Sequence, residues 1–151
     1  MGKILTIVIV LIVTLGAGIF YYYSNSADAP SVPIDEFTTD EEHDDLIRLR
    51  TPRAGEEIRS PLVVTGEARG YWFFEASFPM YLVDWDGKII AQGIAQAQDE
   101  WMTEDFVPFE ATLTFEMPLY EERGALILRK DNPSGLPEHD DALEVQIFYK
   151  K

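Results

Sequence analysis

From residue 46 onward, hydrophobic and polar positions alternate along the chain with a period of two. The alternation is clearest in ATLTF, residues 111–115, and in LEVQIFY, residues 143–149. It is also present in LIRLR, residues 46–50, and in PLVVTGEA, residues 61–68. Because successive side chains of a β-strand point to opposite faces of a sheet, this pattern predicts strands with one buried and one solvated face.

A long apolar stretch lies between these strands. It reads WFFEASFPMYLVDW over residues 72–85 and is followed by Asp86-Gly87 and by KIIAQGIAQA, residues 88–97. Asp-Gly between two β-prone runs is typical of a hairpin turn, because both residues tolerate a positive φ. Pro79 has no N–H to donate, so it predicts an edge position, a bulge or a break in its strand. ALIL, residues 125–128, completes the set of strands.

These segments predict an all-β fold, since no long amphipathic helix accompanies them. The fold class predicted for residues 46–151 is an immunoglobulin-like antiparallel β-sandwich of about seven strands, in which each sheet buries one face. A small barrel is the alternative arrangement. The chain has no cysteine to join the two sheets, so we expect the packing of Trp72, Phe74 and Phe78 to supply the core.

Residues 1–23 predict a membrane anchor before this domain. ILTIVIVLIVTLGAGIF, residues 4–20, has no charge, and three tyrosines follow it. As a helix at about 1.5 Å per residue, these roughly 20 residues would reach about 30 Å, the thickness of the hydrocarbon core of a bilayer. Lys3 and the α-amine precede the span and an acidic segment follows it. The positive-inside rule therefore predicts a single-pass protein of the cell membrane, with its N-terminus in the cytoplasm and its C-terminal domain outside.

A secretory signal is the alternative for the same segment. Ala27-Asp28-Ala29 offers the small-x-small pattern of a cleavage site. The apolar run is longer than the usual core of a signal peptide, which favours an uncleaved anchor. Both alternatives export the domain.

Residues 24–45 predict an acidic flexible linker. The segment is poor in apolar residues and rich in proline, small and acidic residues, so it cannot bury enough surface to offset the entropy of ordering. Repulsion among its carboxylates would extend it. His43 belongs to this linker, and no role is predicted for it.

The net charge excludes several classes of partner. The chain has 12 Lys and Arg residues against 27 Asp and Glu residues, a formal net charge of −15 at pH 7. Such a surface repels phosphates and anionic lipid headgroups, so we expect no nucleic-acid binding and no peripheral basic attachment to a membrane. The absence of cysteine excludes a thiolate metal site, a thiol nucleophile and a lipid-modified cysteine as the anchor.

Five aromatic residues are candidate partner contacts: Tyr71, Trp72, Phe73, Trp85 and Trp101. In a strand, residues 71–74 would send Trp72 and Phe74 to one face and Tyr71 and Phe73 to the other, so at most half of them could be buried on a two-sided sheet. Trp85 and Trp101 lie in or beside predicted turns. Large aromatic side chains supply contact area at low entropic cost. The alternative is that loops bury these rings.

KDNPSGLPEHDD, residues 130–141, is the candidate metal loop. The oxygens for a calcium ion would come from Asp131, Asn132, Glu138, Asp140 and Asp141 together with backbone carbonyls, because Ca²⁺ takes about 6–8 oxygen ligands. The spacing differs from that of an EF-hand loop. The alternative is a structured turn in which the prolines fix φ and the acids stay solvated or accept local N–H groups. No other cofactor is predicted.

Several stretches resemble a known family. The most specific are SPLVVTGEA, WFFEASFP, WMTEDFVPF and KDNPSGLPEHDD, and the similarity extends over about residues 47–149. They resemble the immunoglobulin-like domain associated with bacterial spore-germination proteins. The resemblance implies a β-sandwich accessory module on exported or anchored bacterial proteins, with no established catalytic activity. It also implies a link to germination or sporulation through the proteins that some members accompany.

The sequence therefore favours a membrane-anchored, extracytoplasmic, non-catalytic binding or structural module of the bacterial cell envelope. Its partner would be a protein or a polymer of the envelope. One alternative is a calcium-stabilised envelope domain that uses residues 130–141, and another is an envelope hydrolase. A hydrolase needs polar groups that converge in a pocket, whereas 27 acidic residues provide carboxylate pairs by number alone. No catalytic residue is predicted.

Overall fold

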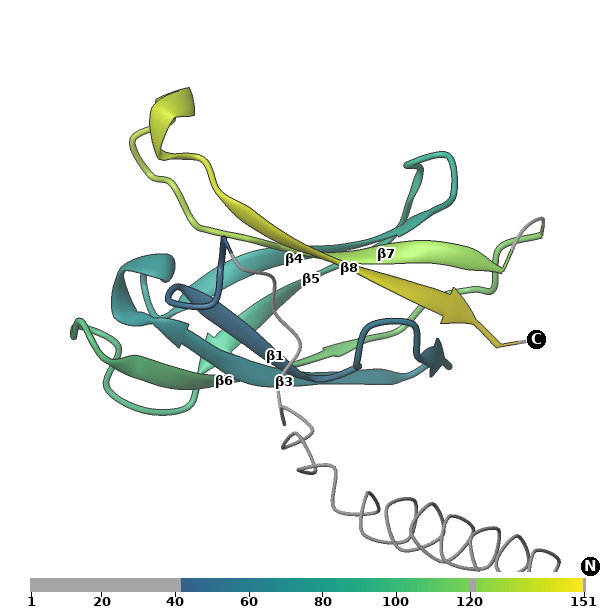
Figure 1. Ribbon diagram of the computed structural model, residues 1–151, viewed down its shortest axis with the longest axis horizontal. Coiled ribbons are helices and arrows are strands. Elements are labelled where there is room, and N and C mark those ends of the chain that lie inside the picture. The colour runs from purple at the N-terminus through teal and green to yellow at the C-terminus, as the bar shows by residue number, and fades with distance from the viewer. Residues whose placement is uncertain (1–41, 120–121, 151) are drawn as a thin grey trace, which may run out of the picture. The chain divides into compact units, whose positions relative to one another are not determined.

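The computed structural model describes residues 42–119 and 122–150 (Figure 1). The predicted anchor, residues 1–23, and residues 24–41 of the predicted linker lie outside the described residues. Within the described part of the chain, no helix has the length and apolar character needed to cross a membrane.

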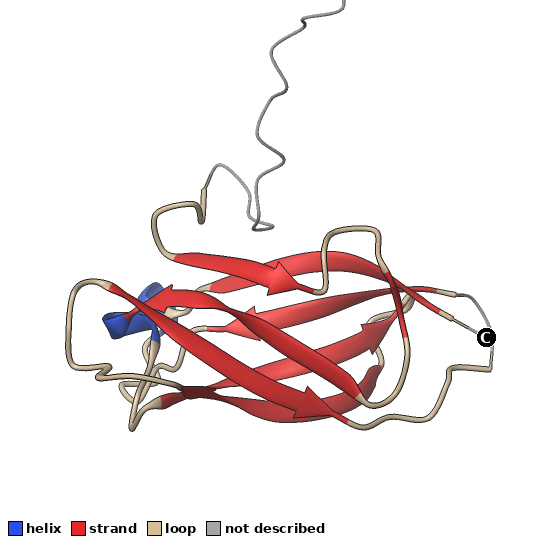
Figure 2. Cartoon of the chain, turned by 90° about the horizontal axis from the view of Figure 1, so that it is seen from below, coloured by secondary structure: helices blue, strands red, loops and turns tan. Residues whose placement is uncertain are grey.

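The described residues form eight strands and two 3-10 helices. In chain order these are β1 (Ile47–Thr51), β2 (Glu57–Ile58), β3 (Leu62–Arg69), η1 (Gly70–Trp72), β4 (Ser77–Asp84), β5 (Ile89–Ala97), β6 (Phe106–Leu113), β7 (Arg123–Arg129), η2 (Pro137–His139) and β8 (Ala142–Tyr149). Figure 2 shows that strands make up most of the domain. The predicted all-β class is confirmed.

The strands form a ladder in the order β1-β3-β6-β5-β4-β7-β8-β2, which folds over into two layers (Figure 1). One layer holds β1, β3 and β6, and the other holds β5, β4, β7, β8 and β2. β5 joins the layers, because only its Gln96 and Ala97 pair with β6. The result is the predicted immunoglobulin-like β-sandwich, in which every strand pairing except that of β2 with β8 is antiparallel.

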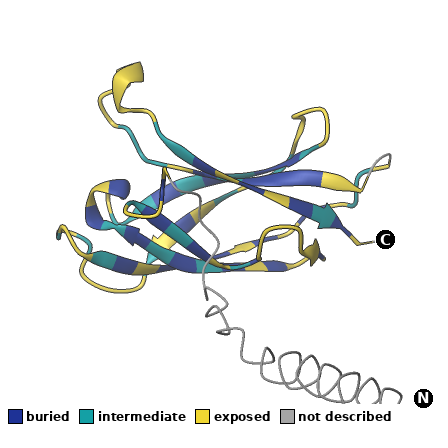
Figure 3. Cartoon of the chain, in the orientation of Figure 1, coloured by how far each residue is buried: buried dark blue, intermediate teal, exposed yellow. Residues whose placement is uncertain are grey.

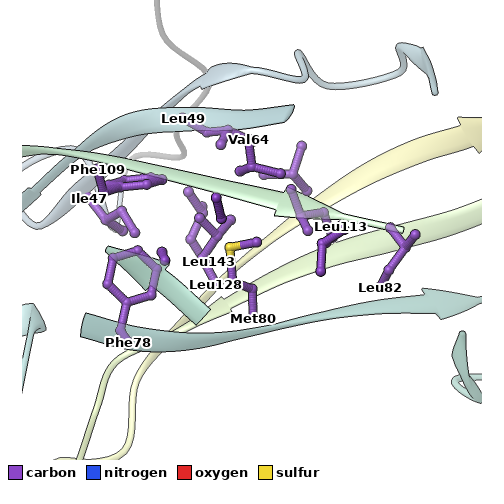
Figure 4. Close-up of a cluster of buried hydrophobic side chains, with 14 of the residues drawn as sticks. Ile47, Leu49, Val64, Phe78, Met80, Leu82, Phe109, Leu113, Leu128 and Leu143 are labelled. Carbon is purple, nitrogen blue, oxygen red and sulfur yellow. The ribbon is translucent and has the colours of Figure 1, made fainter. Parts of the chain in front are cut away.

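The hydrophobic core fills the space between the layers. In β3, β6 and β8 every second residue is buried, as the sequence period predicts. Figure 4 shows side chains of the two layers meeting, among them Val64 and Phe109 from one layer and Met80, Leu128 and Leu143 from the other. Each buried side chain of this size contributes about 1.5–3 kcal/mol through burial. Because the core cluster lies entirely within the compact unit of residues 35–151, we expect that unit to fold by itself.

The predicted hairpin at Asp86-Gly87 is confirmed. It joins β4 to β5, and Gly87 has a φ of +78°, which glycine adopts without steric cost. Pro79 lies within β4 opposite Ile94 of β5, but the ladder with β7 begins only at Met80. The proline therefore occupies a local edge position on the side of β7, one of the three situations that the sequence predicts.

The strand prediction for residues 71–74 is wrong. Residues 70–72 form η1, and Glu75 and Ala76 follow with φ of 49° and 61° in a tight turn, across which the Phe74 N–H donates to the Ser77 carbonyl at 2.9 Å. The period of two is lost here. As a result Phe73 enters the core and packs edge to face on Phe78, with ring centroids 5.2 Å apart, whereas Phe74 is exposed.

The first strand of the sandwich is divided between the two layers. β1 pairs antiparallel with β3, and β2 pairs parallel with β8. The sequence predicts only the β1 part, because a two-residue strand is too short to show a period. β6 also begins at Phe106, before the alternation that the sequence makes visible at residue 111.

Candidate binding site

The five predicted contact aromatics do not form one surface. Tyr71 and Trp85 are exposed, at 50% and 52%, and Trp101 is half-buried against the core. Trp72 and Phe73 are only 0% and 4% exposed. The prediction of a partner contact is wrong for Trp72 and Phe73, because both side chains belong to the hydrophobic core.

The two exposed members of this predicted set, Tyr71 and Trp85, stand at opposite ends of β4. Tyr71 precedes the strand, and the Nζ of Lys130 lies 5.9 Å from the centroid of its ring. Trp85 follows Asp84, the last residue of the strand, at the tip of the hairpin. Because the eight residues of β4 lie between them, a small-molecule ligand would contact one of these two side chains and not both.

The loop of residues 130–141 is closed by its own polar groups. Nη2 of Arg129 and Nδ2 of Asn132 each donate to Oδ1 of Asp140 at 3.0 Å, and Asn132 also donates to the carbonyl of Leu136 at 2.8 Å. These two donors hold the pKa of Asp140 below its ordinary value, the hydrogen bond from Asn132 more than the one from Arg129. The backbone N–H of Asp131 donates to the carbonyl of Trp72 at 3.1 Å and ties the loop to η1.

His43 is part of the folded domain, so its assignment to the flexible linker is wrong. It is 8% exposed, and its Nε2 donates to Oδ1 of Asp141 at 2.9 Å. Its ring meets Trp72 edge to face, with centroids 6.3 Å apart. The same oxygen of Asp141 accepts the backbone N–H of Ala142 at 2.9 Å. The chain thus enters the domain at the end that carries the 130–141 loop.

The structure does not gather the predicted calcium ligands around one point. In residues 42–119 and 122–150 no group of three or more His, Asp or Glu side chains is placed to hold a metal ion. Asp140 and Asp141 already accept hydrogen bonds from protein donors, and the amide of Asn132 faces Asp140 as a donor. Calcium binding through these residues and Asp131 and Glu138 stays a prediction from the sequence alone.

An open hollow of about 390 Å³ lies at the other end of the domain, beside Trp85. It sits on the face of β4, β7 and β8 that points away from the other layer, since Val83, Ala125 and Gln146 alternate with core residues along their strands. The hairpin that carries Trp85 rises above this face (Figure 1), and its tip is exposed (Figure 3). The lining residues are Val83, Asp84, Trp85, Gly87, Arg123, Gly124, Ala125, Glu144 and Gln146.

Strand register explains why these residues meet. Val83 of β4 pairs with Ala125 of β7, and Ala125 pairs with Gln146 of β8, so a row of small and medium side chains forms the floor. Trp85 stands beside one end of this row. Glu144 lies two residues before Gln146 and therefore on the same face of β8.

The floor of the hollow is held from beneath. The hydroxyl of Tyr149, buried in the core, donates to the Val83 carbonyl at 2.9 Å. Its ring lies against Gly124, where a Cβ would come within 2.5 Å of Cε2 of Tyr149 and 2.3 Å of the Val83 oxygen. Burial raises the pKa of the Tyr149 phenol, and the charge of Asp84 adds to this, so the hydroxyl stays protonated and keeps its hydrogen bond.

Three charged or amide side chains of the hollow have no side-chain partner in the described residues. They are Arg123, Glu144 and Gln146, and the indole N–H of Trp85 is likewise unbonded. Asp84 differs, because its Oδ1 accepts the backbone N–H groups of Asp86 and Lys88 at 3.0 and 2.9 Å and shapes the turn. The hollow therefore combines an exposed indole with free donors and free acceptors.

A second, smaller hollow of about 130 Å³ is also lined by Trp85. Its lining residues are Asp84, Trp85, Lys88, Ile90, Pro118 and Leu119. Trp85 and Asp84 line both hollows.

Sequence reasoning finds Trp85 but misses the polar residues around it. Glu144 and Gln146 are recognisable only as the solvated positions of a strand, and Arg123 only as the residue before one. Their proximity to Trp85 follows from the pairing of β4, β7 and β8, for which the sequence holds no local signal.

Residues 46–135 match the family described as the immunoglobulin-like domain of bacterial spore germination. The chain belongs to this family. The match covers more than half of the chain and confirms the resemblance found in its motifs. A search of curated proteins gives no match.

The match to the germination domain family ends before β8. Trp85 and Arg123 lie within the matched residues, whereas Glu144 and Gln146 lie after them. Membership in the family therefore accounts for the strands from β1 to β7, whereas β8, with Glu144 and Gln146, is described by this structure alone.

Proposed function

We propose that this chain is a membrane-anchored, extracytoplasmic module of the bacterial cell envelope, which binds a partner without catalysing a reaction and serves germination or sporulation. The germination link rests on the family to which the chain belongs. The binding role rests on one observation above all, the hollow beside Trp85 with its unpaired polar side chains. Open concave sites with an apolar surface and a few polar groups are the usual form of ligand sites.

The structural use of several carboxylates favours a binding role over catalysis. The carboxylates of the 130–141 loop that contact other side chains, Asp140 and Asp141, do so with structural partners. In the hollow, Oδ1 of Asp84 is occupied by the turn that it forms. Immunoglobulin-like domains are in general binding or structural modules, so the family favours the same conclusion.

The membrane placement is supported by the sequence of the N-terminal segment and is tested by its topology in cells. The full chain with a C-terminal epitope is expressed in a bacterium, and protease is added to intact cells whose outer surface has been made accessible. We expect the epitope to be removed and the chain to sediment with membranes. Ile9→Arg with Ile12→Arg should release the chain from the membrane, because each arginine costs about 2.5–3.5 kcal/mol at the centre of a span. An epitope that is protected in intact cells would contradict the proposed orientation.

The binding role is tested by capture from envelope fractions on immobilised residues 35–151. We expect envelope material to be retained, and we expect Trp85→Ala to lower the retained amount at least about fivefold, because exposed indoles act as binding hot spots. Tyr71→Ala is the matched control, since Tyr71 has nearly the same exposure and lies at the other end of β4. Equal capture by the Trp85 variant and the unaltered domain would remove this hollow as the binding site.

A further inference from the structure

The main-chain groups of β4 and β7, which lie beneath the floor of the hollow, are already paired on both sides. The ladder of β4 with β7 extends from Met80 to Asp84, and the ladder of β7 with β8 extends from Arg123 to Arg129. A peptide that binds by its backbone needs an unpaired strand edge. The floor of this hollow instead presents side chains to a ligand, so recognition there must come from groups that match Trp85, Arg123, Glu144 and Gln146.

These side chains form a mixed set of hydrogen-bonding groups. Glu144 only accepts, Arg123 and the indole N–H of Trp85 only donate, and the amide of Gln146 does both. A ligand that satisfies all of them must carry several groups that donate and accept at short spacing. Hydroxyl groups have this property, and an array of hydroxyls around a rigid ring supplies it in the form of a sugar.

The exposed indole of Trp85 favours a ligand with a flat aliphatic ring. The face of an aromatic ring carries partial negative charge and attracts the slightly positive C–H groups of a flat aliphatic ring. Trp85 is 52% exposed and stands at the side of the floor formed by Val83 and Ala125. A sugar ring stacked on the indole would place its hydroxyls over that floor, within the region lined by Gln146 and Glu144.

Charge excludes one class of glycan. The hollow has two carboxylates, Asp84 and Glu144, against the guanidinium of Arg123, in a chain of net charge −15. Phosphate-bearing and uronic-acid polymers would be repelled by this field. An uncharged glycan pays no such cost.

We propose that the hollow beside Trp85 binds uncharged hexose-type glycan chains, N-acetylated ones included, by stacking one ring on the indole and hydrogen-bonding its hydroxyls to Arg123, Glu144 and Gln146. This inference rests on the proposed binding function and names the ligand class of the same site. A volume of about 390 Å³ lies near the lower limit of small-molecule sites, which run from about 300 to 1,000 Å³, so the hollow holds a short stretch of a chain and not a whole polymer.

The test is a titration of ¹⁵N-labelled residues 35–151 with three uncharged tetrasaccharides, chitotetraose, cellotetraose and maltotetraose, followed by NMR. We expect at least one of them to shift the indole N–H signal of Trp85 and the amide signals of residues 83–87, 123–125 and 144–146. Because an open hollow covers only part of a flexible ligand, we expect Kd values of roughly 0.1–10 mM. Raising NaCl from about 0.05 to about 0.5 M should change Kd less than about twofold, since the ligand carries no charge.

Variants separate the hollow from the rest of the surface. Trp85→Ala should weaken binding at least about tenfold, and Gln146→Ala together with Glu144→Ala should weaken it by a similar factor. Tyr71→Ala should leave Kd unchanged. Thermal unfolding of each variant shows whether a loss of binding reflects a loss of folding. Shifts that map around Tyr71 or the 130–141 loop instead of the hollow would overturn the proposal.

The outcomes distinguish the ligand class from the function. If no tetrasaccharide binds while envelope capture still depends on Trp85, the glycan proposal is overturned and the binding function stands. Polygalacturonate and a mixture of random peptides serve as competitors in that capture. Competition by either of them, with none by the uncharged tetrasaccharides, would also overturn the glycan proposal. If capture too is independent of Trp85, the hollow is removed as the binding site and the glycan proposal fails with it, whereas a loss of all capture would remove the binding function itself.

Discussion

The two ends of this domain use their polar side chains in opposite ways. At the end where the chain enters, which we call the closed end, short hydrogen bonds join four side chains to one another or to nearby protein groups: His43, Asn132, Asp140 and Asp141. At the Trp85 end, which we call the open end, three side chains that line the hollow have no such partner in the described residues: Arg123, Glu144 and Gln146.

A structural loop and a ligand site can both be acidic and contain unusual residues, and they then differ in whether their polar side chains are already bonded to protein groups. From its sequence alone, the 130–141 segment looks more like a functional site than the hairpin that carries Trp85 does, because it concentrates carboxylates, prolines and a histidine. Its Asp140 and Asp141 carboxylates and its Asn132 amide, however, are already bonded to protein groups, so a ligand at these side chains would have to replace bonds that already exist. At the hairpin end Arg123, Glu144 and Gln146 leave their side-chain donors and acceptors to the solvent, where a ligand replaces only water.

The largest effect should come from the buried tryptophan of the closed end. Trp72→Ala removes a side chain that is 0% exposed and contacts His43 and the core, so we expect the free energy of unfolding to fall by about 3–5 kcal/mol. Urea denaturation of residues 35–151 measures this. A loss below about 1 kcal/mol would mean that the closed end is loosely packed and that the contrast between the two ends is false.

The next effect concerns the contact between the entering chain and the loop. His43→Ala leaves the half-buried Asp141 without its imidazole donor, and we expect a loss of about 1–2 kcal/mol. Hydrogen exchange should also become faster for the amides of residues 130–142, because the loop loses a contact that holds it in place. His139→Ala is the matched control, since its side chain is exposed in the same loop and should change stability little. Equal effects of the two substitutions would contradict the role given to His43.

A smaller effect on stability is expected at the open end. Trp85→Ala should change the free energy of unfolding by less than about 0.5 kcal/mol, because half of the side chain is solvated and the turn is shaped by Asp84 and Gly87. The same urea experiment provides the value. A loss comparable to that of Trp72→Ala would show that Trp85 belongs to the fold and would weaken its case as a binding residue.

The smallest effect is expected on the pKa of the Asp140 carboxyl group. Asp140 has its pKa lowered by Asn132 and Arg129, so its contribution to stability is present above the unfolded pKa, ordinarily about 3.8, and is lost as the pH falls through the lower folded value. NMR titration of the carboxyl carbons should therefore give Asp140 a midpoint below 3.8. Asn132→Ala should move that midpoint upward. A midpoint for Asp140 that is unchanged by this substitution would contradict the hydrogen bond from Asn132 to its carboxylate.

The strands could be read from the sequence because each of them carries its own period of two. The hairpin at Asp86-Gly87 was equally local, since the two residues that turn the chain are adjacent. The errors occur where a local rule competes with tertiary structure. Residues 70–76 form η1 and a tight turn in place of a strand, so Phe73 and not Phe74 enters the core. β2 is fixed by its pairing with β8 rather than by its own two residues.

The candidate site could be predicted only in part for the same physical reason. Trp85 is visible because a tryptophan beside a predicted turn is unusual. Arg123, Glu144 and Gln146 become neighbours of Trp85 through register between strands that are distant in the sequence, and His43 meets Asp141 across 98 positions of the chain. Periodicity shows which face of a strand is solvated, but not which solvated positions of different strands come together.

The division of the first strand has a consequence for proteolysis. The connection between β1 and β2 is exposed from Arg53 to Glu56, so a protease such as trypsin can reach it at Arg53. One cut there would separate β1 from β2, the outermost strands of the two layers, which cover the edges of β3 and β8. If β1 and β2 then dissociated, each layer would expose a bare strand able to pair with another molecule, and the nicked protein would be prone to self-association.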